Sequence, residues 1–312
     1  MKAFALCLDR VGEDVTPEQG VLSPLDISAS WPARSERARE DQLRKADALL
    51  VNVTSVDSAL FDRCPRCGVV VTYGVGYDHI DLDEARRRQV IVANVPDYCT
   101  DEVADHTMAL MLAIARQIPA GDKIVRTGRW GVQELSPIRR IKGRTLGLVG
   151  LGRTGRAVAV RACGFGLRVI AHDPFAATGS EAVTMVDSLP GLLREADFVS
   201  LHVPLRLDTT QLIDEHALSL MKPGAILVNT SRGGLVDVEA LVRALDRGSL
   251  AGAGLDVYPE EPPNAAQLDR PNLLLSPHSA YYSAEAIIEL KRSAAQAVAV
   301  VLTGGTPTHR LT

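Results

Sequence analysis

The chain has 312 residues, enough for two domains, and 46% of them are hydrophobic, so each domain can bury a core. A formal net charge of −4 gives no basic surface of the kind that binds nucleic acid. No apolar run approaches the ~20 residues that span a bilayer, and the N-terminus lacks the features of a signal peptide. We therefore expect neither a nucleic-acid partner nor a membrane partner.

The five cysteines are an odd number without framework spacing, which indicates reduced thiols and a cytoplasmic location. Two of them lie close together in Cys64-Pro-Arg-Cys67. A redox or zinc function for this motif needs a thioredoxin-like context or a second ligand pair, and the sequence offers neither. We expect both side chains to pack in a core, and we expect no metal site.

The first hundred residues alternate apolar strands with helical stretches. Strands are expected at 48–53, 69–72 and 90–93, and helices at 35–45 and 82–88. This alternation predicts a small α/β domain with a doubly wound, flavodoxin-like parallel sheet. We assign residues 1–98 to this domain, as the part of the chain that binds substrate.

Residues 96–100 interrupt this pattern, and a helix is expected at 101–116 with Thr100 as its cap. The surface of that helix is apolar nearly all round. Such a helix is usually buried between domains or subunits.

Three glycines near the middle of the chain form the most informative motif. Gly150, Gly152 and Gly155 have the dinucleotide-binding spacing Gly-x-Gly-x-x-Gly, between a strand-like run at 145–149 and a helix-like run at 156–162. The glycines let the backbone approach a pyrophosphate, and the helix N-terminus then stabilises its charge. The order of strand, turn and helix predicts a Rossmann domain.

The next apolar run, 167–171, leads to Asp173 at about the distance where a carboxylate meets the adenosine ribose. A carboxylate accepts hydrogen bonds from the ribose hydroxyls and repels a 2′-phosphate. No arginine follows nearby in the sequence. We therefore expect NAD as the cofactor rather than NADP.

Further strands and helices alternate after Asp173. The expected strands are 198–203, 225–229, 252–256 and 273–275, and the expected helices are 188–195, 216–221 and 238–247. We place the Rossmann domain at 99–282. A last helix at 283–302 is expected to return to the first domain, which then also contains 283–312.

Three polar residues come just after strands of the Rossmann domain: Arg232, Glu261 and His278. Ligands bind at that edge of an open parallel sheet. Taken singly, each residue has an ordinary explanation, because such an arginine is commonly a surface charge, such a glutamate caps a loop, and such a histidine is a satisfied hydrogen bonder. Their combination beside a nicotinamide cofactor fits the reduction of a 2-oxo acid.

That reaction needs a cation for the carboxylate and carbonyl, and a proton donor for the carbonyl oxygen. Arg232 offers a planar, permanently charged fork. His278 can give the proton during reduction and take it during oxidation. Glu261, bonded to the other ring nitrogen, would fix the tautomer of the histidine.

The chain resembles the D-isomer-specific 2-hydroxyacid dehydrogenases, the family of phosphoglycerate, glyoxylate/hydroxypyruvate and D-lactate dehydrogenases. The resemblance runs from about residue 46 to residue 302, and the first forty-odd residues match only loosely. The motifs that carry it are Tyr73–Asp81, Val149–Gly155, Leu201–Leu205, Asn229–Gly234 and Ser276–His278. It implies an NAD-dependent enzyme for a small (R)-2-hydroxy acid and its 2-oxo acid, with Arg232, Glu261 and His278 as the catalytic set.

The resemblance also implies contacts for the ligands. The backbone of Val75 and Gly76 would meet the substrate carboxylate, together with Arg232 and His278, and Tyr281 would form a wall of the pocket. Besides the three fingerprint glycines and Asp173, the cofactor would contact Thr107, Arg153, Thr154, Val203, Pro204, Thr209, Thr230, Ser231, Arg232, Asp256, His278 and Ala280. The family further implies a homodimer, and a cleft between the domains that closes on the bound ligands.

Two alternatives stay open. The stretch 279–283 resembles the C-terminal-binding-protein corepressors, which suggests an NADH-sensing binding protein; those proteins, however, have an arginine at the position of Thr72 and a tryptophan at the position of Tyr281. The second alternative is a specialised biosynthetic dehydrogenase for a phosphonate or a similar carboxylate mimic. An anion-binding loop together with Arg232 would accept such a group.

Overall fold

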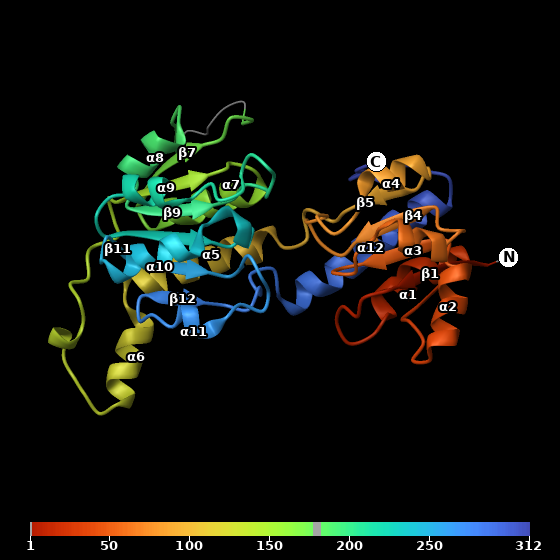
Figure 1. Cartoon of the computed structure of the whole chain (residues 1–312), viewed down its shortest axis with the longest axis horizontal. Helices are drawn as coiled ribbons and strands as arrows, with labels where there is room; N and C mark the ends of the chain where they lie inside the picture. The colour runs from red at the N-terminus through yellow and green to blue at the C-terminus, as the bar shows by residue number, and fades with distance from the viewer. Residues whose placement is uncertain (1, 177–181) are drawn as a thin grey trace. The chain divides into compact units, whose positions relative to one another are not determined.

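The computed structural model describes residues 2–176 and 182–312 (Figure 1). The chain forms two compact units. The first contains the residues up to Cys99 together with Tyr282–Thr312, and the second is Thr100–Tyr281. Within the described residues, no helix has the length and apolar character needed to cross a bilayer.

The first unit is a five-stranded parallel sheet in the order β2-β1-β3-β4-β5. Its strands are β1 (Ala3–Cys7), β2 (Ile27–Ser30), β3 (Ala48–Val51), β4 (Val69–Thr72) and β5 (Ile91–Ala93). Its helices are α1 (Thr16–Leu22), α2 (Glu36–Lys45), α3 (Ser58–Arg63), α4 (Leu82–Arg87) and α12 (Ala284–Leu302), with a 3₁₀ turn η1 (Ser23–Leu25). The order 2-1-3-4-5 is that of flavodoxin-like folds.

Helix α12 belongs to this unit although almost two hundred residues separate it from β5. It packs on α1 and against β4. The C-terminal segment also returns to the sheet, where the Leu311 N–H donates to the Val92 carbonyl at 2.8 Å. The expected return of the last helix is therefore confirmed.

The second unit is a seven-stranded parallel sheet in the order β12-β11-β10-β9-β6-β7-β8. Its strands are β6 (Thr145–Val149), β7 (Arg168–His172), β8 (Val183–Met185), β9 (Phe198–Leu201), β10 (Ala225–Asn229), β11 (Leu250–Leu255) and β12 (Leu273–Leu275). Counted along the chain from β6, this is the Rossmann order 3-2-1-4-5-6 with one added strand. The chain reverses its direction of winding between β6 and β9.

Helices cover both faces of this sheet. They are α5 (Thr100–Ala115), α6 (Ile118–Arg126), α7 (Arg153–Gly164), α8 (Leu189–Glu195), α9 (Glu215–Leu220), α10 (Val238–Asp246) and α11 (Ala265–Leu268), with 3₁₀ turns η2 (Val132–Glu134) and η3 (Gly233–Leu235). Because side chains alternate along a strand, Leu146 and Leu148 join the core under α5 and α7, while Val149 joins the core under α8, α9 and α10. Two doubly wound parallel sheets were predicted, and the structure confirms them.

Several details differ from the expectations. Thr100 is the first residue of α5 rather than a residue outside it, and the helix expected at 156–162 begins at Arg153. The apolar surface of α5 packs on α7, β10 and β11, which belong to the same unit. Burial of this surface therefore does not require an interface between domains or subunits. The elements that the sequence patterns did not predict are β1, β2, α1, α3, α6, β8 and α11.

None of the five cysteines, all of which lie in the described part of the chain, forms a disulfide, and Cys64 and Cys67 are buried in the core of the first unit. Burial raises the pKa of the Cys64 thiol to about 11 and that of Cys67 to about 12. Both side chains are therefore neutral core residues, as predicted.

Candidate active site

The fingerprint glycines lie where β6 ends and α7 begins. Gly150 has a φ of +95°, a conformation that favours glycine, and a Cβ there would lie 2.6 Å from the carbonyl oxygen of His202. A Cβ at Gly155 would overlap the carbonyl oxygen of Gly150. A Cβ at Gly152, in contrast, would meet no atom within 4 Å and would project into open space.

That open space fits a pyrophosphate. Gly152 is the N-cap residue of α7, a helix of 12 residues, and provides no side-chain cap. The helix begins at Arg153 and Thr154, and the positive end of its dipole lies there, where helices bind anions. Only glycine at position 152 leaves the space empty, so the residues present fit a dinucleotide.

The loop after β9 lies beside the fingerprint at the point where the winding reverses. The Ser231 hydroxyl donates to the Val203 carbonyl at 2.7 Å, and the Thr209 hydroxyl donates to the Pro204 carbonyl at 2.8 Å. Residues expected at the cofactor are thus gathered at the carboxyl edge of β6, β9 and β10. This is where open parallel sheets bind ligands.

Asp173 follows β7 and joins the same edge. Its carboxylate accepts the Leu151 N–H at 2.8 Å and the Phe175 N–H at 2.9 Å. A cation also lies nearby, because the Arg206 guanidinium stacks 5.8 Å above the Phe175 ring. No arginine follows Asp173 nearby in the sequence; Arg206 comes from the loop after β9, which is distant along the chain, so the local sequence does not indicate it. Residues 177–181, which follow Phe175 and Ala176, lie outside the described ranges.

Two threonines meet on the α5 side of the sheet. The Thr107 hydroxyl donates to the Val103 carbonyl at 2.7 Å, and the Thr107 and Thr230 hydroxyl oxygens lie 2.7 Å apart. Since a hydroxyl has one proton to donate, Thr230 is the donor of this second bond. Both residues are buried, and the pair connects α5 with the end of β10.

Arg232 follows in the same segment, half-buried. The Asn229 side-chain amide donates to the Arg232 carbonyl at 2.8 Å, and the Arg232 guanidinium donates to the Ser231 carbonyl at 2.8 Å. The next residue is Gly233, where a Cβ would overlap the backbone carbonyl of Tyr258. This close approach brings the Arg232 segment against the segment that contains Glu261.

His278 and Glu261 form a direct pair. The His278 Nδ1 atom lies 2.7 Å from the Glu261 Oε2 atom, and the other carboxylate oxygen accepts the Tyr258 N–H at 3.1 Å. Because a carboxylate only accepts, Nδ1 carries the hydrogen and Nε2 is left for proton exchange. Tyr281 makes an edge-to-face contact with the imidazole, with ring centroids 6.1 Å apart.

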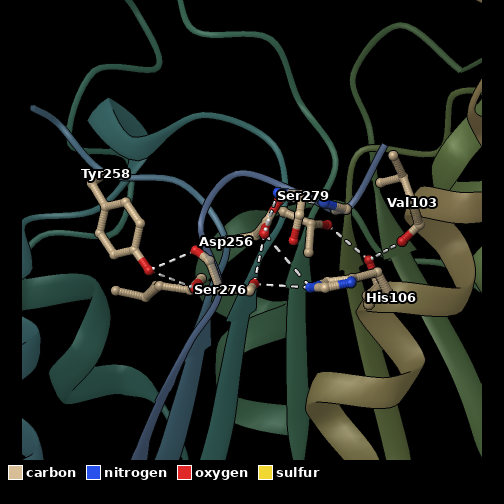
Figure 2. A network of polar contacts seen from close by, with 10 residues as sticks. Val103, His106, Asp256, Tyr258, Ser276 and Ser279 are labelled. Atoms are coloured by element: carbon tan, nitrogen blue, oxygen red, sulfur yellow. Dashed lines mark hydrogen bonds and ion pairs between the residues drawn. The ribbon is translucent and has the colours of Figure 1, made fainter. Parts of the chain in front are cut away.

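Asp256 holds the segment that presents His278. Figure 2 shows its carboxylate among Tyr258, Ser276 and Ser279, with His106 approaching from α5. The carboxylate accepts the Ser276 hydroxyl at 2.6 Å and the N–H groups of Ser279 and Ala280 at 2.9 Å each. Its backbone carbonyl accepts the His278 N–H at 2.8 Å. The carboxylate of Asp256 is therefore committed to this turn.

His106 and Ser276 complete this network, and sequence reasoning assigned them no role. The His106 Nε2 atom lies 2.8 Å from the Ser276 hydroxyl, and the Tyr258 hydroxyl donates to the Ser276 carbonyl at 2.9 Å. Only position offered a signal: Ser276 directly follows β12, and His106 lies one residue before Thr107. Their contact joins residues 170 positions apart, so no local pattern indicates it.

The loop Gly74–Gly76 lies in the first unit, at the carboxyl end of β4. Each of its carbonyls is held: Gly74 accepts from the Val95 N–H at 3.0 Å, Val75 from the Asn94 amide at 2.8 Å, and Gly76 from the Thr72 hydroxyl at 3.3 Å. The N–H groups of Val75 and Gly76 have no acceptor among the residues described. Consecutive free N–H groups of this kind form an anion-binding concavity.

Across residues 2–176 and 182–312, no three histidine, cysteine, aspartate or glutamate side chains are grouped so as to hold a metal ion.

The groups at the carboxyl edge of the second sheet suit hydride exchange between a dinucleotide and a polar substrate. The class they define is that of the nicotinamide-dependent dehydrogenases. Within that class, a model described as "D-isomer specific 2-hydroxyacid dehydrogenase, NAD binding domain" matches residues 108–280, and the chain belongs to this family.

Individual relatives agree with this family. Glyoxylate reductase from Thermococcus litoralis is 45% identical over 249 residues, covering 76% of this chain and 75% of that protein. Among solved structures, the TT0316 protein from Thermus thermophilus has a TM-score of 0.87 and 37% identity, covering 99% of this chain and 100% of that one. D-Lactate dehydrogenase from Aquifex aeolicus, complexed with NAD and lactic acid, has a TM-score of 0.84 and 30% identity, covering 96% of each chain. The chain is thus an NAD-dependent D-2-hydroxyacid dehydrogenase that interconverts hydroxy and oxo acids.

Proposed function

We propose that this enzyme reduces a small 2-oxo acid with NADH, and that glyoxylate is its first candidate substrate. The observation that carries the mechanism is the 2.7 Å contact between His278 Nδ1 and Glu261. This contact keeps one hydrogen on Nδ1, so Nε2 is the atom that exchanges a proton: the doubly protonated imidazolium donates from Nε2 to the substrate carbonyl oxygen during reduction, and Nε2 then takes a proton from solvent. Arg232 binds the carboxylate and polarises the carbonyl.

NADH, when bound, supplies the hydride. The chain's own residues orient it: Gly150, Gly152 and Gly155 admit the pyrophosphate, and Asp173 accepts from the ribose hydroxyls. The phosphates and the adenosine would be held by Arg153, Thr154, Val203, Pro204 and Thr209. The nicotinamide would be held by Thr107, Thr230, Ser231 and Ala280. Asp256 contributes by fixing the turn that carries His278.

The choice of glyoxylate is supported by the names of the relatives, since glyoxylate reductases from two Thermococcus species and from Korarchaeum cryptofilum are 45%, 44% and 41% identical to this chain. A substrate with a carboxylate is supported by the loop of the first unit, where the N–H groups of Val75 and Gly76 are free to bind an anion. We therefore propose that residues 1–98 with 283–312 are the substrate domain and that 99–282 are the cofactor domain. Tyr281, packed on the His278 ring, would limit the size of the substrate side chain.

The test is a spectrophotometric assay of NADH oxidation with glyoxylate, hydroxypyruvate, pyruvate, phenylpyruvate and phosphonopyruvate. We expect the highest kcat/KM with glyoxylate, and a loss of about a hundredfold or more in His278→Gln and in Arg232→Ala. Full turnover by either variant would contradict the assigned roles. Tight NADH binding without turnover of any oxo acid would favour the sensor alternative instead.

We also propose that the protein is a homodimer. The segment around α6 exposes Ile118, Val125, Trp130 and Val132, and exposed large apolar side chains gathered on one segment are typical of an interface. A pocket of about 810 Å³ lies between this segment and the amino edge of the second sheet. Sedimentation equilibrium should give twice 33.5 kDa for the wild type and a smaller mass for Trp130→Asp. A wild-type monomer would contradict this proposal.

A cytoplasmic location is proposed as well. Its support is that none of the five described cysteines forms a disulfide, as is usual for proteins of a reducing compartment. Fractionation of cells that express the tagged protein tests it, and recovery outside the cytoplasmic fraction would contradict it.

A further inference from the structure

A buried polar cluster lies in the first unit and plays no part in the mechanism above. Its members are Cys7 at the end of β1, Glu18 in α1, Tyr73 directly after β4, and Lys291 in α12. Their exposed fractions are 0%, 1%, 2% and 1%. Buried charges are costly unless they are paired, so two of them in one core require an explanation.

The contacts within this cluster run through Glu18. Its Oε1 atom accepts the Tyr73 hydroxyl at 2.6 Å, and its Oε2 atom lies 3.5 Å from the Lys291 ammonium. Lys291 also donates to the carbonyls of Val11, at 2.8 Å, and of Asp14. The carboxylate is therefore held on one side by a fixed cation and offers its other side to a single phenol.

Tyr73 is neutral in this environment. Burial raises the pKa of its hydroxyl well above the ordinary value and raises the pKa of the neighbouring Cys7 thiol to about 12. The Tyr73 hydroxyl is thus a donor that keeps its proton. A hydrogen bond from a neutral donor to a carboxylate is stronger than one between two neutral groups.

The position of Tyr73 in the chain connects this cluster with the substrate loop. Tyr73 is the residue immediately before Gly74–Gly76, and its own N–H donates to the Val51 carbonyl at 2.6 Å. The backbone hydrogen bond joins it to β3, and the side-chain hydrogen bond joins it to α1. The hydroxyl of Thr72, the residue before Tyr73, donates to the Gly76 carbonyl at the other end of the loop. The start of the loop is therefore fixed from three directions.

We propose that Tyr73 is a positioning residue for the substrate. Its hydrogen bond to Glu18, itself held by Lys291, orients the start of the loop so that the N–H groups of Val75 and Gly76 converge on the substrate carboxylate. This proposal rests on the proposed function of that loop. If the cluster served only to join α1 to α12, its loss would lower stability without changing substrate binding.

Tyr73→Phe separates these two roles, because phenylalanine keeps the ring and removes the hydroxyl. We expect the KM for glyoxylate to rise about tenfold, the loss that follows from weakening one charged hydrogen bond. We expect kcat to change by less than about twofold, because the N–H groups bind ground state and transition state alike. The Kd for NADH, measured by fluorescence, should stay unchanged, since the cofactor residues belong to the second unit.

Asp47→Ala is the matched control. Asp47 lies directly before β3, at the opposite end of the sheet from the loop. Its carboxylate accepts the Phe4 N–H at 2.9 Å and pairs with Arg66. This variant should lower the thermal midpoint of unfolding and leave the KM for glyoxylate unchanged. An equal rise of KM in both variants would show that general loosening of the unit causes the effect, and it would overturn the proposal.

A second variant applies if Tyr73→Phe does not fold. Replacing Glu18 by Leu together with Lys291 by Met removes the acceptor of Tyr73 without leaving a lone buried charge, and such replacements often preserve stability. The KM for glyoxylate should again rise about tenfold. A wild-type KM in either variant overturns the role of Tyr73. If the wild type itself reduces no 2-oxo acid, the proposed function is at fault instead.

Discussion

At the scale of single residues, His278 has an unusual backbone. Its φ is +52°, a left-handed conformation that costs a residue with a side chain about 1–3 kcal/mol. The cost is offset by Asp256, which accepts the N–H groups of Ser279 and Ala280 through its carboxylate and that of His278 through its carbonyl. The direction of the imidazole thus depends on a carboxylate that does not touch it.

Asp256→Asn tests this dependence. An amide offers one acceptor oxygen in place of two, so at least one of the three donors to the carboxylate loses its partner. We expect kcat to fall about ten- to a hundredfold, with a loss of stability of about 1–3 kcal/mol. Steady-state kinetics and urea unfolding measure the two effects. Asp269→Asn, at an exposed position, is the control, and an unchanged kcat in Asp256→Asn would contradict the role of Asp256.

His202 gives the stability a pH dependence. Desolvation lowers its pKa from 6.5 to about 4, and Ser200 lies 2.9 Å from its Nε2 atom. Between these pH values the unfolded chain binds the proton and the folded chain does not. The stabilising contribution is therefore fully present above pH 6.5 and is lost as the pH falls toward 4.

We expect His202→Gln to reduce the loss of stability between pH 6.5 and 4 by on the order of 2 kcal/mol. Urea unfolding at a series of pH values measures this slope. Equal slopes in the wild type and in His202→Gln would refute the assignment.

At the scale of elements, the strands best indicated by the sequence are those buried on both faces. The bounds expected for β4, β6 and β10 agree with the structure, because continuous apolar runs mark such strands. The bounds expected for β12 agree as well, although this edge strand is only partly buried. The sequence patterns did not predict the first elements of the first unit, α1 and β2 among them, and the reason is physical. Helix α1 buries the charged Glu18 along with Leu22, so it shows no apolar stripe, and β2 at the sheet edge alternates polar with apolar residues.

The residues of the candidate site likewise divide into those that the sequence indicated and those that it did not. Arg232 and His278 could be found because each comes just after a strand, and strand ends are readable from the sequence. His106, Arg206 and the Tyr73–Glu18 contact could not, since each depends on a partner from a distant element. The sequence thus indicated the groups proposed for the chemistry better than the groups that hold them.

The turn between β6 and α7 allows stability and cofactor binding to be separated. Gly152→Ala should leave the thermal midpoint nearly unchanged, because its Cβ meets no protein atom, and should raise the Kd for NADH about a hundredfold by filling the pyrophosphate space. Gly155→Ala should cost about 1–3 kcal/mol of stability, because its Cβ would overlap the Gly150 carbonyl. Fluorescence titration and thermal unfolding provide the measurements. Similar destabilisation in both variants would contradict this division.

At the scale of the whole molecule, the two units differ in how the chain builds them. The second unit is one continuous segment with a core on each face of its sheet, whereas the first is assembled from two segments. We expect a fragment of residues 100–281 to fold and to bind NADH, since it has its own cores. It should reduce no glyoxylate, because it lacks the Gly74–Gly76 loop. Circular dichroism and NADH titration test this, and an unfolded fragment would contradict it.

The late position of α12 has a consequence for synthesis on the ribosome. The chain that forms β1 to β5 emerges first, but its sheet has no α12 to cover β4, and Glu18 has no Lys291, until the entire second unit has been translated. At ordinary elongation speeds that interval is about 10 to 40 s. During this time the nascent first unit carries an uncovered apolar face and an unpaired carboxylate, so a chaperone that holds it until α12 arrives would act on the unit that was made before the other.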